Sequence, residues 1–186
     1  MSLVRAWVRG HHGPAVAATS AGLTAVLLLG AGALMPVPGE VVALPVWQLT
    51  PTGYALLSAF ATVNRLPEVA VDRRLWRARS VWLTAVTASA AGGAWLVDAR
   101  SGLPSLVPAT ALLVVVSFGA SVVVGRWAVW VGGLAALWIL FHVADYASTV
   151  TTPWQVPSGL RLGVLVAVAG IAVAAYVVRG GRVTRA

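Results

Sequence analysis

Long apolar runs alternate along the chain with short clusters of Arg, Pro and Gly. A bilayer hydrocarbon core about 30 Å thick is crossed by a helix of roughly 20 apolar residues. The runs therefore predict six transmembrane helices, at about residues 14–35, 46–63, 81–97, 104–124, 127–144 and 160–178. The second run is the most polar of them, because it contains Gln48, Thr50 and Thr52. We expect one all-α, polytopic transmembrane domain over residues 1–186.

The arginines predict how this domain is oriented. Cytoplasmic segments of membrane proteins retain positive charge. If the N-terminus is inside, eleven of the thirteen basic residues face the cytoplasm, and only Arg100 and Arg161 face outward. Without the second span, the arginine-rich segment after residue 63 would lie outside. We therefore predict both termini in the cytoplasm and a multi-pass location in the inner (plasma) membrane.

Two short helices are predicted outside the spans. Before the first span, apolar residues at positions 3, 4, 7 and 8 share one helical face, with Arg5 and Arg9 on another. This pattern predicts an interfacial N-terminal helix. Between the second and third spans, Pro67 suits a first helical turn, and acidic residues precede basic ones as the helix dipole favours. Residues 65–79 are thus expected to contain a short cytoplasmic helix.

The cytoplasmic segment has two interpretations. It offers both charge signs to a soluble partner, or it is a basic loop that holds lipid headgroups. Membrane orientation explains the arginines of this segment but not its acidic residues, so Glu68 and Asp72 are the positions that best indicate a partner. The candidate partner-binding residues are Arg65, Glu68, Asp72, Arg73, Arg74 and Arg77.

Composition agrees with the membrane class. The chain is 59% hydrophobic and 10% charged, with a net charge of +8, whereas a soluble domain carries roughly 25% charged residues. It has no Cys and no Lys, which removes thiol chemistry, Cys-ligated metals and every GK[ST] phosphate-binding motif. No HExxH or GxSxG motif occurs. We predict no enzymatic activity, cofactor, metal site or nucleic-acid partner.

A few polar and aromatic residues remain as candidates. His142 and Asp145 form an i,i+3 pair at the outer end of the fifth span, where a proton relay or a solvated helix end is possible, and the solvated end is favoured. His11 and His12 are expected at the surface. Most tryptophans fall near span ends, as in an aromatic belt. Trp138 lies within a span and is the candidate for lining a substrate path.

The whole layout resembles the membrane subunit of a type V ATP-binding-cassette exporter. The matching positions are residues 3–9, 65–79 and 145–159, which correspond to an interfacial helix, a coupling helix and an outer re-entrant element. The run from Leu56 to Arg74 is similar to the same region of small actinobacterial permeases. The resemblance implies export of a hydrophobic or amphiphilic substrate, powered by a separate ATPase that docks at residues 65–79.

The alternatives are an accessory or assembly subunit of a larger membrane complex and an intramembrane enzyme. Six helices are too few to form an adequate channel. Transport would therefore require a homodimer or a related second permease subunit, whereas an accessory role would not.

Overall fold

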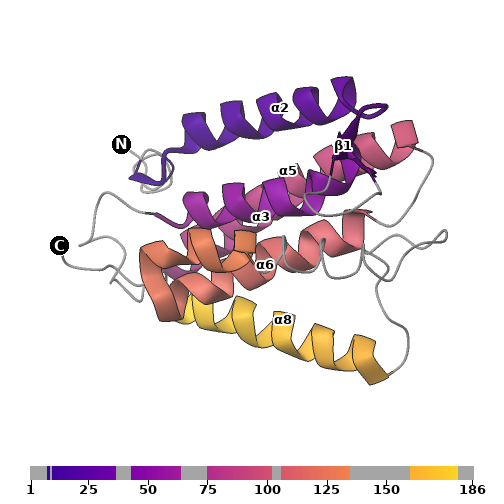
Figure 1. The fold of residues 1–186 in the computed structure, drawn as a ribbon. Helices are drawn as coiled ribbons and strands as arrows, with labels where there is room; N and C mark the ends of the chain where they lie inside the picture. Colours follow the sequence, from indigo (N-terminus) through magenta and orange to yellow (C-terminus); the bar gives the residue numbers. More distant parts are fainter. Residues whose placement is uncertain are drawn as a thin grey trace.

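A computed structural model describes residues 8, 10–36, 43–63, 75–101, 106–134 and 160–179. The longer elements are five helices and a two-stranded hairpin: α2 (Gly13–Leu29), β1 (Leu34–Pro36), β2 (Ala43–Pro45), α3 (Thr50–Ala61), α5 (Trp76–Ser101), α6 (Leu106–Val124) and α8 (Leu160–Arg179). Two short 3₁₀ helices, η1 (Val46–Leu49) and η3 (Gly125–Trp127), precede α3 and follow α6. The described part of the chain is mainly helical, as predicted (Figure 1).

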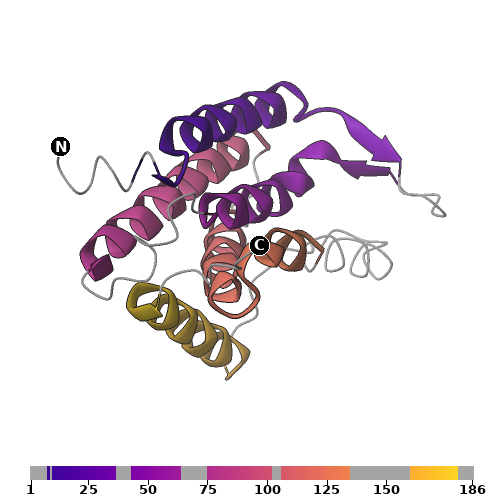
Figure 2. The same cartoon turned by 90° about the vertical axis from the view of Figure 1, so that its left-hand side faces the viewer.

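The helices form a bundle with α6 at its centre. Helix α6 packs against α3, α5 and α8, while α2 packs against α5 and α3. Helices α2 and α8 therefore lie on opposite sides of the central group (Figures 1 and 2). Helices α2 and α5 run in one direction, and α3, α6 and α8 run in the other. As a result, the start of α2 and the end of α8 lie at the same end of the bundle.

The contact between α6 and α8 depends on small residues. A side chain at Gly119 of α6 would overlap the methyl group of Ala172 on α8. Small residues at such a position allow two helix backbones to approach closely. Beside this contact, Phe118 meets Tyr176 edge-on, with ring centroids 4.7 Å apart. The two helices are thus joined by backbone proximity and one aromatic pair.

Two of the described helices are long and apolar enough to cross a membrane, namely α5 and α6. At 1.5 Å per residue their 26 and 19 residues correspond to about 39 Å and about 28 Å. Helix α2 and the 163–179 part of α8 are apolar but shorter. The structure therefore supports two candidate spans among the six predicted, namely α5 and α6. The predicted run at 160–178 is confirmed as a helix, α8, but not as a span.

The first two predicted spans need correction. Helix α2 ends at Leu29, not at residue 35, and the chain enters an antiparallel hairpin in which Leu34 pairs with Pro45. Residues 46–63 form η1 followed by the 12-residue α3, not one continuous span. The physical reason is Pro51, which lacks an N–H and suits a first helical turn. The α-helix therefore begins at Thr50 instead of running through the proline.

The third span is longer than predicted at both ends. Helix α5 begins at Trp76, so Arg77 and Arg79 belong to it and not to a separate cytoplasmic helix. At its other end α5 includes Asp98, whose carboxylate accepts hydrogen bonds from the backbone N–H groups of Leu106 (3.2 Å) and Val107 (3.3 Å). A carboxylate here satisfies free donors in the first turn of α6.

Three further predictions lie wholly or largely outside the described residues. These are the interfacial helix at 3–9, the cytoplasmic segment up to residue 74 and the outer element at 145–159. The predicted fifth span, 127–144, is described only as far as Leu134, where the chain is helical after η3.

Candidate functional site

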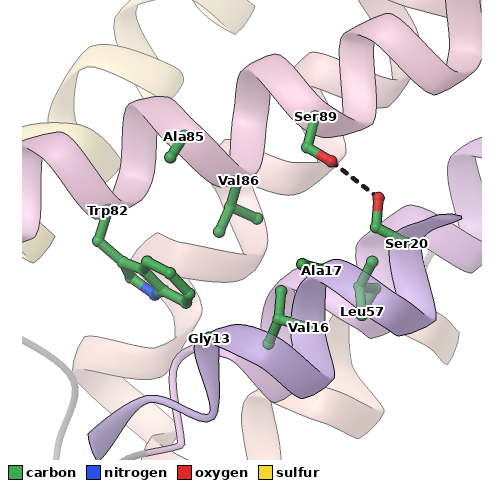
Figure 3. A pocket seen from close by; sticks show the side chains of 9 residues that line it. All are labelled: Gly13, Val16, Ala17, Ser20, Leu57, Trp82, Ala85, Val86 and Ser89. Atoms are coloured by element: carbon green, nitrogen blue, oxygen red, sulfur yellow. Dashed lines mark hydrogen bonds between the residues drawn. The ribbon is translucent and has the colours of Figure 1, made fainter. Parts of the chain in front are cut away.

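A small groove lies between α2 and α5 (Figure 3). Its volume is about 130 Å³. Helix α2 contributes Gly13, Val16, Ala17 and Ser20, helix α5 contributes Trp82, Ala85, Val86 and Ser89, and α3 contributes Leu57. Residues three, four and seven apart share one face of a helix. The spacing in both helices therefore turns one continuous, mostly apolar face of each toward the groove.

The polar groups of the groove are gathered at one end. The hydroxyl oxygens of Ser20 and Ser89 are 2.8 Å apart and hydrogen-bonded (Figure 3). This bond ties α2 to α5 across the groove. The two hydroxyls satisfy each other's hydrogen bonding. The side chains between this pair and Trp82 are apolar, so this part of the groove is lined mainly by carbon atoms.

Trp82 closes the other end of the groove. Its indole Nε1 donates a hydrogen bond to the carbonyl oxygen of Ala61 at 3.0 Å, and its ring lies 5.9 Å from that of His11. Ala61 is the last residue of α3, where helix carbonyls lack partners within the helix. Trp82 and His11 are buried. The expectation of a surface position for His11 is therefore wrong.

A second polar contact continues along α2 beyond the groove. The hydroxyls of Thr24 on α2 and Tyr54 on α3 are hydrogen-bonded at 2.5 Å. The Tyr54 hydroxyl lies directly against Gly93 of α5, where any side chain would overlap it. This contact joins α2, α3 and α5 at one point inside the bundle.

Arg79 connects α5 to α8 at the end of the bundle where α8 terminates. Its side chain is fully buried, and Nη1 donates to the carbonyl oxygens of Val177 (3.3 Å) and Val178 (3.0 Å). A cation is favourable at the C-terminal end of a helix, which carries partial negative charge. The sequence predicted Arg79 in the cytoplasmic segment at 65–79, because nothing local shows that α8 ends beside it.

The predicted partner-binding residues are only partly described. Arg77 lies in the first turn of α5, is exposed, and stacks over Trp76 at 5.2 Å from the ring centroid. The other predicted site residues lie outside the described part of the chain: Arg65, Glu68, Asp72, Arg73, Arg74, Trp138, His142 and Asp145. Of the predicted partner-binding group, the structure therefore describes Arg77 alone.

Within the described ranges, His, Asp and Glu form no group of three or more that could hold a metal ion. No family model, curated protein or solved structure matches this chain. The site is therefore described by its own geometry, an apolar groove inside the bundle. Arg77 and Arg79 at the start of α5 and Arg179 at the end of α8 lie at one end of the bundle, and Asp98 and Arg100 at the end of α5 lie at the other.

Proposed function

We propose that this protein is a multi-pass subunit of the plasma membrane, and that it acts as the permease subunit of an ATP-driven exporter of a hydrophobic or amphiphilic substrate. The observation that best supports the proposal is the alternating direction of α2, α3, α5 and α6, combined with arginines at the end where α2 starts and α8 stops. Positive charge at one end of such a bundle is what a cytoplasmic face requires.

The outer surface of the bundle also fits a lipid environment. Large apolar side chains are exposed on separate helices, including Leu29 of α2, Val123 of α6 and Ile171 of α8, the last with 70% of its surface exposed. Contiguous exposed apolar surface is unfavourable in water and marks an interaction site, including contact with a membrane. In a bilayer these side chains contact acyl chains.

In this proposal the chain crosses the membrane an even number of times. Helices α6 and α8 end at the same end of the bundle, so the chain between Val124 and Leu160 returns from one end to the other. Together with the antiparallel α2, α3, α5 and α6, this return gives an even number of passes. Both termini then lie in the cytoplasm, as the arginine distribution favours.

The topology has a direct test, because the chain contains no cysteine. We expect a cysteine at Ser101, the last residue of α5, to react in intact cells with an impermeant thiol reagent. A cysteine at Arg74 should react only after the cells are opened. Labelling of intact cells is measured by mass spectrometry or gel shift. The reverse pattern, with Arg74→Cys reacting from outside, would overturn the orientation.

Export would require partners. The groove of about 130 Å³ is smaller than the about 300–1,000 Å³ typical of sites for drug-sized ligands. A path for an amphiphile would therefore form between two chains, either a homodimer or this chain with a related permease subunit. Because the sequence has no GK[ST] motif, ATP hydrolysis would take place in a separate subunit.

The exporter proposal predicts that binding of the ATPase depends on the acidic residues of the cytoplasmic segment. We expect Glu68→Arg with Asp72→Arg to release an ATPase that co-purifies with the wild-type chain, because loss of one partner of a desolvated charge pair costs about 2–5 kcal/mol. The measurement is retention of the ATPase and its ATP turnover after purification from native membranes. Arg100→Glu, a charge reversal at the opposite end of α5, is the matched control and should retain it.

A second candidate function is favoured by the polar interior. The hydroxyl pairs Ser20–Ser89 and Thr24–Tyr54 bind each other between helices. Such pairs stabilise a static bundle, as expected of an accessory or assembly subunit. If the wild-type chain carries no ATPase, or the charge-reversed chain retains ATPase with unchanged turnover, the accessory function takes first place.

A further inference from the structure

An arginine and a tryptophan form an exposed pair at the start of α5. The guanidinium carbon of Arg77 lies 5.2 Å from the centroid of the Trp76 ring, and Trp76 keeps 50% of its surface exposed. A guanidinium over an aromatic ring is held by its face, whereas its N–H donors lie in its plane and remain available. These donors match the oxygens of a phosphate in a bidentate arrangement. The pair therefore presents an ordered cation at the surface of the bundle.

Two further side chains give this end of the bundle the same character. Arg179, the last residue of α8, and Trp127 of η3 are both exposed. The last turn of α8 is joined to α5 through Arg79, so Arg77 and Arg179 lie at the same end of the bundle (Figure 1). The first turn of α5 contains no acidic residue, and Asp98, the one acidic residue within the described ranges, lies at the other end of this helix. Positive charge and exposed indole rings are therefore gathered at one end.

The spacing of the two exposed tryptophans of α5 fits the thickness of a bilayer. Trp95 keeps 61% of its surface exposed and lies 19 residues after Trp76 in the same helix (position 76 to position 95). At 1.5 Å per residue this is about 28 Å, close to the about 30 Å of a hydrocarbon core. Tryptophan rings favour the boundary between hydrocarbon and headgroups. When Trp95 lies at one boundary, Trp76 lies at the other, and Arg77 reaches the lipid phosphates because helix side chains lean toward the N-terminus.

We propose that Arg77, held over Trp76 and assisted by Arg179, binds the phosphate of an anionic phospholipid in the cytoplasmic leaflet. Arg77 is thereby assigned to the lipid and not to the ATPase, for which the sequence made it a candidate. The proposal rests on the membrane location and orientation given under the proposed function, but it does not depend on an ATPase. The bound lipid fixes the depth at which α5 enters the bilayer.

The test is lipid binding by the full-length protein in mild detergent, measured by native mass spectrometry. Phosphatidylglycerol and phosphatidylcholine with identical acyl chains are the probes. We expect the wild type to bind phosphatidylglycerol more tightly than phosphatidylcholine. Arg77→Gln should weaken phosphatidylglycerol binding about fivefold, the equivalent of about 1 kcal/mol for one basic residue near an anionic surface. Adding Arg179→Gln should weaken it further and leave phosphatidylcholine binding unchanged.

Matched controls separate the site from the net charge. Arg100 is exposed at the other end of α5, so Arg100→Gln removes the same charge and should bind phosphatidylglycerol as the wild type does. Arg77→Lys should be intermediate, because an ammonium keeps the charge but lacks the planar fork. Equal losses in Arg77→Gln and Arg100→Gln, or equal affinity of the wild type for both lipids, would overturn the proposal. Release of a co-purifying ATPase by Arg77→Gln, with phosphatidylglycerol binding unchanged, would assign Arg77 to the protein partner instead.

Two measurements need no change at the proposed site. Phosphatidylglycerol with a photoreactive headgroup should crosslink to peptides that contain residues 76–77 or 179, and crosslinks confined to other peptides would refute the site. The chain has no cysteine, so spin labels can be placed singly at the exposed Val81, Ala85, Ala88 and Gly92 of α5. In vesicles the label at Ala85, midway between Trp76 and Trp95, should lie deepest. A label at Ala85 that stays in water would refute the membrane location itself, whereas the expected depth without a preference for phosphatidylglycerol would refute the phosphate site alone.

Discussion

Arg79→Ala is expected to lower the free energy of unfolding by about 3 kcal/mol, because it removes charge-assisted hydrogen bonds from a buried site. For a chain of this length the melting temperature in detergent should fall by about 6–12 °C. The carbonyl oxygens of Val177 and Val178 lose the cation that Arg79 presents to them. The C-terminal turn of α8, a helix that packs mainly on α6, thereby loses its hydrogen bonds to α5.

The region that is destabilised distinguishes loss of the Arg79 hydrogen bonds from a general loss of packing. Hydrogen exchange should increase in peptides from α8 and remain unchanged in peptides from α2, on the opposite side of the bundle. Arg79→Lys should be intermediate, because an ammonium lacks the planar fork of a guanidinium. Arg77→Ala on the same helix is the matched control, since Arg77 is exposed, and should change little. Equal effects of the two alanine variants would contradict the role assigned to Arg79.

The second large effect is expected at Gly93. Gly93→Ala should destabilise the protein by about 2 kcal/mol, as overpacking of a filled interior does, which corresponds to a fall in melting temperature of about 4–8 °C. A methyl group here overlaps the Tyr54 hydroxyl and lies 2.9 Å from the Thr24 hydroxyl. Relief requires α2 or α3 to move away from α5, which strains the hydrogen bond between Thr24 and Tyr54.

The adjacent glycine provides a control with the same change in helix propensity. A side chain at Gly92 meets nothing within 4 Å, so Gly92→Ala should be neutral or stabilising, because Ala favours a helix by about 1 kcal/mol over Gly. Tyr54→Phe should partly rescue Gly93→Ala, since it removes the oxygen that the methyl group overlaps. Thermal unfolding of the wild type, Gly93→Ala, Tyr54→Phe and the double variant forms a double-mutant cycle. Equal effects of alanine at positions 92 and 93 would contradict the close contact.

Local patterns predicted the helical class and several helix positions. A helix is favoured wherever a long apolar run must satisfy its own backbone, so the runs at 104–124 and 160–178 matched α6 and α8 closely. The same reasoning misplaced the boundaries of other elements. It carried the first helix past Leu29, merged η1 with α3 across Pro51, and placed Arg77 and Arg79 in a separate cytoplasmic segment ahead of α5. These errors arose because hydropathy averages over turns, prolines and single charges.

What the sequence determined alone is therefore the membrane-type composition, the helical class and the charge difference between segments, since each depends on residues close together in the chain. The tertiary structure decided the pairings between distant residues. Arg79 meets Val178, Trp82 meets Ala61, and Ser20 meets Ser89 only because α5 packs against α8, α3 and α2 in the bundle. The groove of the candidate site exists for the same reason: its two main walls are separated by more than sixty residues in sequence, and only the packing of α2 against α5 brings them together.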